Sequence, residues 1–135
     1  MTTSRSLRVG LFGGTFDPPH NAHVALARAA LEALQLDELR WIPAGAPWQK
    51  ARAITPAAHR EALVRLAIAG ERRLVLDRIE LERPGPSYTI DTVRAMRAGS
   101  TRPSTPRHHC TFQQSSCMGH LRTDILGRRA TVAAR

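Results

Sequence analysis

The feature that most constrains the fold is a strand–helix–strand pattern in the first 43 residues. The apolar run Leu7–Phe12 leads into two glycines, as a buried strand before a tight turn does. Residues Asn21–Gln35 are rich in Ala and Leu at helical spacing, and Leu39–Pro43 is a second short apolar run closed by proline. Such segments with short connections are typical of parallel strands in an α/β sheet.

The same kind of pattern continues to about residue 98. Thr55 followed by proline predicts a helix start with Thr55 as N-cap, and Gly70 predicts the end of that helix. Residues 73–83 predict a third strand, because apolar and charged side chains alternate in its second half. A further helix is expected to begin near Thr89, its candidate N-cap.

After Ala98 the sequence changes character. Residues 99–135 are rich in Ser, Thr, Arg, His and Pro and show no sustained helical or strand period. We therefore divide the chain into a patterned region, residues 1–98, and a basic tail, residues 99–135, which we expect to be irregular and disordered. A GC-rich gene that is read out of frame gives such a composition, so we interpret the tail as following a change of reading frame. A genuine but divergent tail is the alternative.

Positive charge is concentrated in the tail. The chain has a net charge of +9, and residues 1–98 carry 14 Lys and Arg against 10 Asp and Glu, whereas the tail carries six Arg against one acidic residue. An excess of basic over acidic residues favours anionic partners. No basic stripe alternates with aromatic residues, however, so nucleic acid is not the expected partner.

Cysteine usage and hydropathy exclude several classes of protein. Cys110 and Cys117 do not indicate a disulfide framework in a chain without a recognisable signal peptide. No apolar run is long enough to cross a bilayer, so we expect a cytoplasmic protein without membrane contact. A zinc site in the tail is a weak alternative, because the candidate ligands lack the spacing of a standard finger; these are His108, His109, Cys110, Cys117 and His120.

The segment Gly13–His23, GGTFDPPHNAH, predicts a phosphate site. A strand, a glycine pair and a helix start together aim backbone N–H groups at an anion. His20 and His23 lie on one face of the first helical turn, and both imidazoles can donate hydrogen bonds to phosphate oxygens. Each residue alone also fits a turn or a solvated surface. Neither the P-loop nor the dinucleotide-binding fingerprint matches, and the histidine spacing does not fit a helical metal site, so no metal ligands are expected.

This segment resembles the G-x-F-D-P-x-H-x-G-H signature of the adenylyl- and cytidylyltransferase superfamily, with Ala22 where the family usually has glycine. The resemblance implies a doubly wound, Rossmann-like α/β fold with a parallel sheet. Pro47–Lys50, PWQK, resembles a loop that carries a lysine near the phosphates. Pro86–Val93, PSYTIDTV, resembles the S-Y-T-x-D-T segment of the bacterial nicotinate-nucleotide adenylyltransferases.

The resemblance implies a reaction of ATP with nicotinate mononucleotide that gives nicotinate adenine dinucleotide and pyrophosphate, with Mg²⁺ accompanying ATP. It implies catalytic roles for His20, His23 and Lys50. It also implies two sets of binding residues: for the nucleotide Gly13, Gly14, Thr15 and Phe16, and for the mononucleotide Thr89, Asp91 and Trp48. Asp91 equally fits a first-turn acid that complements a helix dipole, and Trp48 equally fits a loop anchor. The sequence does not predict the oligomeric state.

One part of the family pattern is missing. The family's later I-S-S-T-x-x-R segment, which opens a helix and grips the ATP phosphates, has no counterpart after residue 98. We therefore expect only the N-terminal half of the sheet and a poor or inactive enzyme. Two alternatives stay open: another adenylyltransferase of the superfamily, such as one acting on phosphopantetheine, and a nucleotide-binding fragment without catalysis.

Overall fold

The computed structural model describes residues 7–46, 53–99, 108–114, 120–125 and 128–133. The strands are β1 (Arg8–Gly14), β2 (Glu38–Pro43), β3 (Leu74–Leu76), β4 (His108–Gln114), β5 (His120–Ile125) and β6 (Arg128–Ala133). The helices are α1 (Asn21–Ala33), α2 (Ala57–Ile68), α3 (Ile79–Glu82) and α4 (Thr89–Ala98). In the described part of the chain, no helix is long and apolar enough to cross a membrane.

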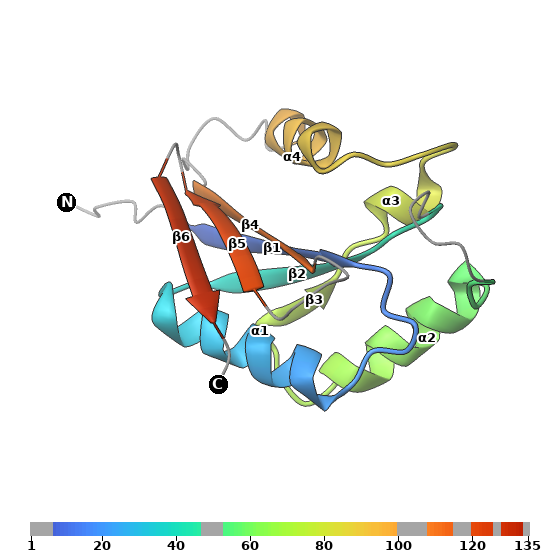
Figure 1. The fold of residues 1–135 in the computed structure, drawn as a ribbon, viewed down its shortest axis with the longest axis horizontal. Coiled ribbons are helices and arrows are strands. Elements are labelled where there is room, and N and C mark those ends of the chain that lie inside the picture. The colour runs from blue at the N-terminus through green and yellow to red at the C-terminus, as the bar shows by residue number, and fades with distance from the viewer. Residues whose placement is uncertain (1–6, 47–52, 100–107, 115–119, 126–127, 134–135) are drawn as a thin grey trace.

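All six strands belong to one sheet, in the order β3-β2-β1-β4-β5-β6 (Figure 1). The first four strands in chain order run parallel, whereas β5 and β6 are antiparallel to their neighbours. The strands that follow β1 in the chain lie on both sides of it, with β2 and β3 on one side and β4 on the other, so the strand order reverses between β1 and β4. β1 and β4 are parallel, and their carboxyl ends therefore lie at the same edge of the sheet. In doubly wound α/β folds, ligands bind outside the carboxyl ends of the strands at such a reversal.

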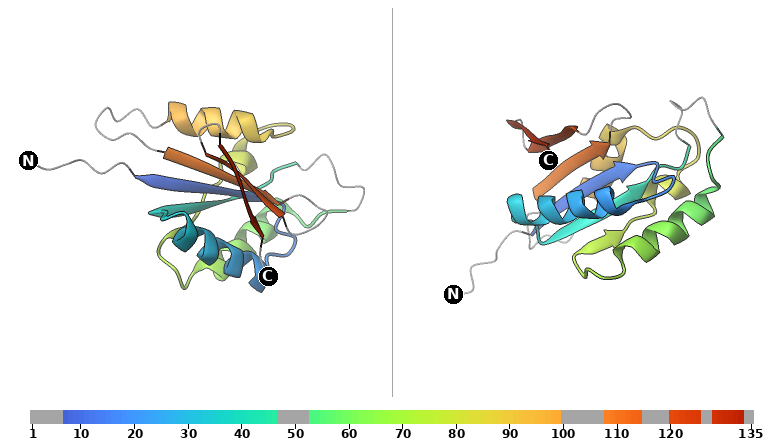
Figure 2. Two further views of the ribbon diagram at one scale, coloured as in Figure 1. Left: turned by 60° about the vertical axis from the view of Figure 1, so that its left-hand side comes forward. Right: turned by 60° about the horizontal axis from the view of Figure 1, so that its bottom comes forward.

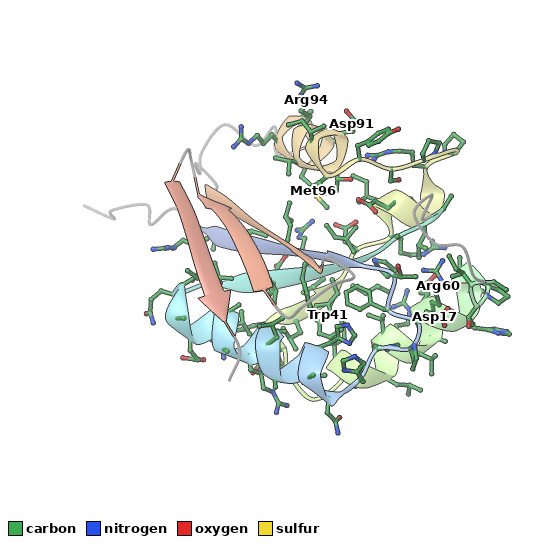
Figure 3. All side chains as sticks on the ribbon, in the orientation of Figure 1. Asp17, Trp41, Arg60, Asp91, Arg94 and Met96 are labelled. Carbon is green, nitrogen blue, oxygen red and sulfur yellow. The ribbon has the colours of Figure 1, made fainter. Side chains whose placement is uncertain are left out.

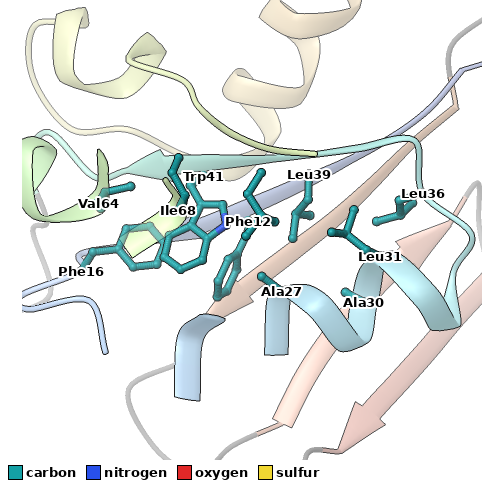
Figure 4. Packing of buried hydrophobic residues seen from close by; sticks show 11 residues of the cluster. Phe12, Phe16, Ala27, Ala30, Leu31, Leu36, Leu39, Trp41, Val64 and Ile68 are labelled. Atoms are coloured by element: carbon teal, nitrogen blue, oxygen red, sulfur yellow. The ribbon is translucent and has the colours of Figure 1, made fainter. Parts of the chain in front are cut away.

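The side chains of β1 and β2 alternate between two cores, one on each face of the sheet. Phe12, Leu39 and Trp41 pack toward α1 and α2 in the larger cluster (Figure 4). On the opposite face, Val9, Leu11 and Ile42 are buried with partly buried side chains of α3 and α4. Helices thus lie on both faces of β1–β3 (Figures 1 and 2). This arrangement confirms the predicted doubly wound α/β fold and explains why these strands are nearly continuous apolar runs.

Several predicted boundaries differ from the structure. The expected strand over residues 73–83 is wrong in its second half, where β3 ends at Leu76 and α3 follows. The carboxylate of Asp77 accepts a hydrogen bond from the N–H of Ile79 at 3.0 Å, which closes a local turn and ends the strand. The two helix starts are each shifted by one residue, because the N-caps are Pro56 and Tyr88.

The expectation that residues after 98 are irregular is wrong for β4, β5 and β6. Gly10 of β1 pairs with Cys110 of β4, and β5 and β6 continue the sheet as antiparallel strands. Strands pair through backbone N–H and C=O groups, which every residue except proline carries in full. A strand can therefore form without the side-chain alternation on which the prediction relied. The division of the chain at residue 98 into two parts stays a prediction.

Candidate phosphate-binding site

The candidate site lies at the carboxyl end of β1, next to the reversal of strand order. Gly13 and Gly14 are the last two residues of β1 and are paired with Ile42 and Pro43 at the end of β2. The loop after Gly14 leads directly to α1, which begins at Asn21. We call residues 13–17, the two glycines and the first part of this loop, the glycine turn. The glycine turn and the helix start are adjacent, as an anion site of this kind requires.

The structure brings His20 and His23 together at the start of α1. His20 is the N-cap residue, and its backbone N–H donates a hydrogen bond to Nδ1 of His23 at 3.1 Å. The centroids of the two rings are 3.8 Å apart. His23 is 5 % exposed and lies edge-on to the ring of Phe16, whereas His20 is exposed to solvent.

This hydrogen bond orients the ring of His23. Because Nδ1 accepts a hydrogen bond from the backbone N–H of His20, Nε2 is the ring nitrogen that is left to donate. His23 can therefore act as a hydrogen-bond donor in a fixed orientation, and its ring is held by packing as well as by the helix N-terminus.

Phe16 lies between the glycines and the histidines, with its side chain in the core. Phe16 is 1 % exposed, and its ring is stacked on Trp41 with centroids 4.9 Å apart. Its backbone has a φ of +50°, an unusual conformation for a residue with a side chain. The phenyl ring belongs to the hydrophobic core (Figure 4), so a ligand could meet only the main chain of Phe16.

Arg60 of α2 is a residue that the sequence reasoning missed. Its side chain is among the most buried of the protein, with 1 % exposure, and it lies beside Asp17 (Figure 3). The guanidinium donates to backbone carbonyls of three segments: Thr15 at 3.0 Å, Ala44 at 2.7 Å and Thr55 at 2.8 Å. Burial lowers the pKa of Arg60 from its ordinary value, but a guanidinium stays charged in proteins.

A signal for Arg60 was present in the sequence. Arg60, Val64 and Ile68 are spaced by four residues and are the buried residues of α2, so the arginine occupies the apolar stripe of its helix. An arginine in that position needs several acceptors, and backbone carbonyls of neighbouring loops are available only in the folded chain. The position was therefore recognisable, but its partners were not.

At α4, the residues of the S-Y-T-x-D-T segment differ in how deeply they are buried. Thr89 is the first residue of the helix and half-buried, and Asp91 is exposed in the first turn. The buried member is Thr92, whose hydroxyl donates to Glu80 at 2.6 Å and accepts from Arg83 at 3.2 Å. Burial raises the pKa of Glu80, against the opposing effects of the Thr92 hydroxyl and the Arg83 charge.

Two predicted site residues, Trp48 and Lys50, lie outside the described residues. Among the side chains that are described, no three His, Cys, Asp or Glu groups come together as a metal site. The zinc alternative in the tail concerns side chains outside this set. The described site thus consists of the glycine turn, the paired histidines and the buried arginine behind them.

The arrangement of strand, glycine turn and histidine-capped helix defines an α/β protein with a candidate phosphate site. A family model described as cytidylyltransferase-like matches residues 11–122. The chain therefore belongs to the cytidylyltransferase-like family, as the resemblance of its motifs implied.

Similar proteins are consistent with this family. A probable nicotinate-nucleotide adenylyltransferase of Methylibium petroleiphilum is 58 % identical over 94 residues, which are 70 % of this chain and 44 % of the relative. One of Bordetella petrii, of the same description, is 56 % identical over 91 residues, 67 % of this chain and 47 % of the relative. The chain thus spans about half the length of the curated relatives it matches.

A solved structure shares the fold at low sequence identity. The nicotinic acid mononucleotide adenylyltransferase of Plasmodium falciparum, complexed with NaAD, matches with a TM-score of 0.63 and 15 % identity. The match covers 79 % of this chain and 50 % of the other. At this identity the likeness supports the fold alone.

Proposed function

We propose that this chain binds ATP and nicotinate mononucleotide and transfers the adenylyl group to the mononucleotide, giving nicotinate adenine dinucleotide and pyrophosphate. The observation that carries the proposal is the pair formed by His20 and His23 at the carboxyl end of β1, directly after a glycine turn. The names of the relatives support the substrate pair.

The proposed chemistry needs no covalent intermediate. A phosphate oxygen of the mononucleotide attacks the α-phosphorus of ATP and forms a new P–O bond, while the bond to the bridging oxygen breaks and pyrophosphate leaves with the electron pair. Because the nucleophile is already an anion, catalysis consists of positioning and charge stabilisation. Nε2–H of His23 and the ring of His20 are placed to donate to phosphate oxygens whose charge grows in the transition state.

The other proposed roles follow from the family resemblance. Lys50 neutralises the phosphates as a point charge, and Thr89, Asp91 and Trp48 belong to the mononucleotide end. Gly13, Gly14, Thr15 and Phe16 present backbone to the nucleotide. Mg²⁺ enters with ATP, held by phosphate oxygens and water.

The proposal is tested by combining binding and turnover measurements on the 135-residue chain. We expect calorimetric titration to detect Mg·ATP and nicotinate mononucleotide, and chromatography to detect nicotinate adenine dinucleotide at less than about one turnover per second, below the ordinary range. Absence of binding by both ligands contradicts the proposal, as does a preference for phosphopantetheine as the adenylyl acceptor.

A second function, nucleotide binding without catalysis, is favoured by one observation. The I-S-S-T-x-x-R segment, with which the family grips the ATP phosphates, has no counterpart in residues 99–135. Binding of both ligands without any product would support this alternative. Thr89→Val is a further test of the mononucleotide end, because it should weaken nicotinate mononucleotide by about 0.5–1.5 kcal/mol and leave ATP unchanged. Arg94→Gln, at an exposed position of the same helix, is the control.

A further inference from the structure

We propose that Arg60 is a positioning residue that holds the glycine turn in its binding conformation, a role that rests on the proposed function of that turn. Arg60 lies on α2, more than 40 residues after the turn in the sequence, and its buried side chain lies near Asp17 (Figure 3). Its guanidinium donates to backbone carbonyls, so it acts through the backbone that it binds.

Four backbone carbonyls from three segments converge on this one side chain. Nη1 donates to the carbonyls of Thr15, after β1, and Ala44, after β2. Nη2 donates to the carbonyl of Gly45 at 3.4 Å, and Nε donates to that of Thr55, before α2. The planar guanidinium therefore fixes the ends of β1 and β2 relative to the start of α2. An ammonium group has no such fork and cannot reproduce the arrangement.

Asp17 completes the connection from the side of the turn. Its Oδ2 accepts a hydrogen bond from the N–H of Thr55 at 3.0 Å, and its negative charge favours the cation of Arg60. The turn is thus tied to the start of α2 twice, once through the Thr15 carbonyl and once through the Asp17 carboxylate. Between these two points lies Phe16.

The conformation of Phe16 shows why such a restraint is needed. A φ of +50° is unfavourable for a residue with a side chain, and it persists only where the surroundings enforce it. The ring of Phe16 is held by stacking on Trp41 and by the edge of His23. The backbone before and after it is held by Arg60 and Asp17. Loss of the Arg60 fork should therefore release the turn and, through the Phe16 ring, shift His23.

The first test compares Arg60→Lys with Arg65→Lys in the full 135-residue chain. Arg65 lies on the same helix, but its ion pair with Glu61 is at the surface, so it is the matched control. We expect Arg60→Lys to accelerate amide hydrogen exchange at residues 14–17 at least tenfold relative to the amides of β2, and to weaken Mg·ATP at least tenfold. We expect no such change in Arg65→Lys. Uniform acceleration along the chain, wild-type behaviour of Arg60→Lys, or the same effect in Arg65→Lys would each overturn the proposal.

Two further measurements guard against a variant that fails to fold. In the unmodified chain, the Nε–H and Nη–H protons of Arg60 should give separate, slowly exchanging NMR signals, because all three nitrogens donate to carbonyls. Averaged and rapidly exchanging guanidinium signals would contradict the role. The amide exchange of the glycine turn is measured without substrates. If the chain is inactive but Arg60→Lys accelerates exchange in the turn, the positioning role is supported and the proposed function is refuted. If the chain is active but exchange in the turn is unaffected, the proposed function is supported and the positioning role is refuted.

Discussion

Two regions of one sheet are held together in different ways. In β1–β3, side chains of both faces enter hydrophobic cores under helices, and the more extensive helix–strand contacts within the described residues involve β2 or β3. In β4–β6, the extensive contacts are between neighbouring strands. Backbone pairing thus extends the sheet beyond β1, and the candidate site lies at the end of a strand whose buried side chains enter cores on both faces.

The largest effect is expected from the core under β2. Trp41 is fully buried, so Trp41→Ala should lower the free energy of unfolding by about 3–5 kcal/mol in urea titrations. Trp41→Phe keeps an aromatic ring and removes an indole N–H that has no hydrogen-bond partner among the described residues, so it should cost much less. Leu66→Ala, at a position that is 75 % exposed, is the control and should change stability by less than about 0.5 kcal/mol. A small effect of Trp41→Ala would mean that this region is not held by its core.

The next largest effect concerns the chemistry at the end of β1. His20→Ala and His23→Ala should each reduce turnover by about 100- to 1000-fold, about 3–4 kcal/mol, and affect ATP affinity much less, because a preorganised donor acts mainly on transition-state charge. His59→Ala, an exposed histidine of α2, should leave both quantities unchanged. If either variant keeps wild-type turnover, the histidine that it replaces does not have the proposed catalytic role. Single-turnover measurement of nicotinate adenine dinucleotide is the assay, since it detects slow product formation.

A smaller effect distinguishes the second region. β4 has a partner strand on each side, so a proline removes a ladder hydrogen bond whichever way the replaced amide points. Thr111→Pro should therefore destabilise the pairing of β4 by about 1–3 kcal/mol, the cost of leaving a backbone group unsatisfied. Thr111→Ala should cost less than this if backbone pairing is the dominant interaction. Both variants are compared by urea unfolding, and a larger loss in Thr111→Ala would show that side chains hold this region after all.

The smallest effect is a pH dependence within the first region. Burial raises the pKa of Glu80 above its ordinary value of 4.5, so the folded protein takes up this proton at a higher pH than the unfolded chain. The contribution of Glu80 to stability therefore rises as the pH falls through the raised pKa toward 4.5, and is lost again as the pH rises. Glu80→Gln should remove this dependence in urea titrations between pH 7 and pH 4, whereas Glu82→Gln, at a more exposed position, should retain it.

The sequence predicted the parts of the fold that depend on local patterns. The strand–helix–strand unit, the glycine turn and the adjacent histidines follow from apolar periodicity and residue type, and the structure contains them. The switch from β3 to α3 was not predicted, because it depends on a hydrogen bond that the carboxylate of Asp77 accepts from the N–H of Ile79. The strands of the tail were missed because backbone pairing leaves no side-chain period.

The candidate site was predictable only in its directly recognisable residues. His20 and His23 stand three apart in one motif, so their proximity followed from helix geometry. Arg60 acts on carbonyls of distant segments, and no short-range pattern gives the approach of Thr15, Ala44 and Thr55 to one side chain. Tertiary contacts of this kind become visible only in the folded chain.

Native-state hydrogen exchange tests the central comparison most directly. We predict that the amides of β2 exchange only when the whole protein unfolds, and that the amides of β5 and β6 exchange through a partial opening at least about tenfold more often, corresponding to a free energy lower by about 1.4 kcal/mol or more. The candidate site at the end of β1 should stay protected during that opening. Equal protection of β2, β5 and β6 would contradict the account, because it would show one cooperative sheet rather than two regions held in different ways.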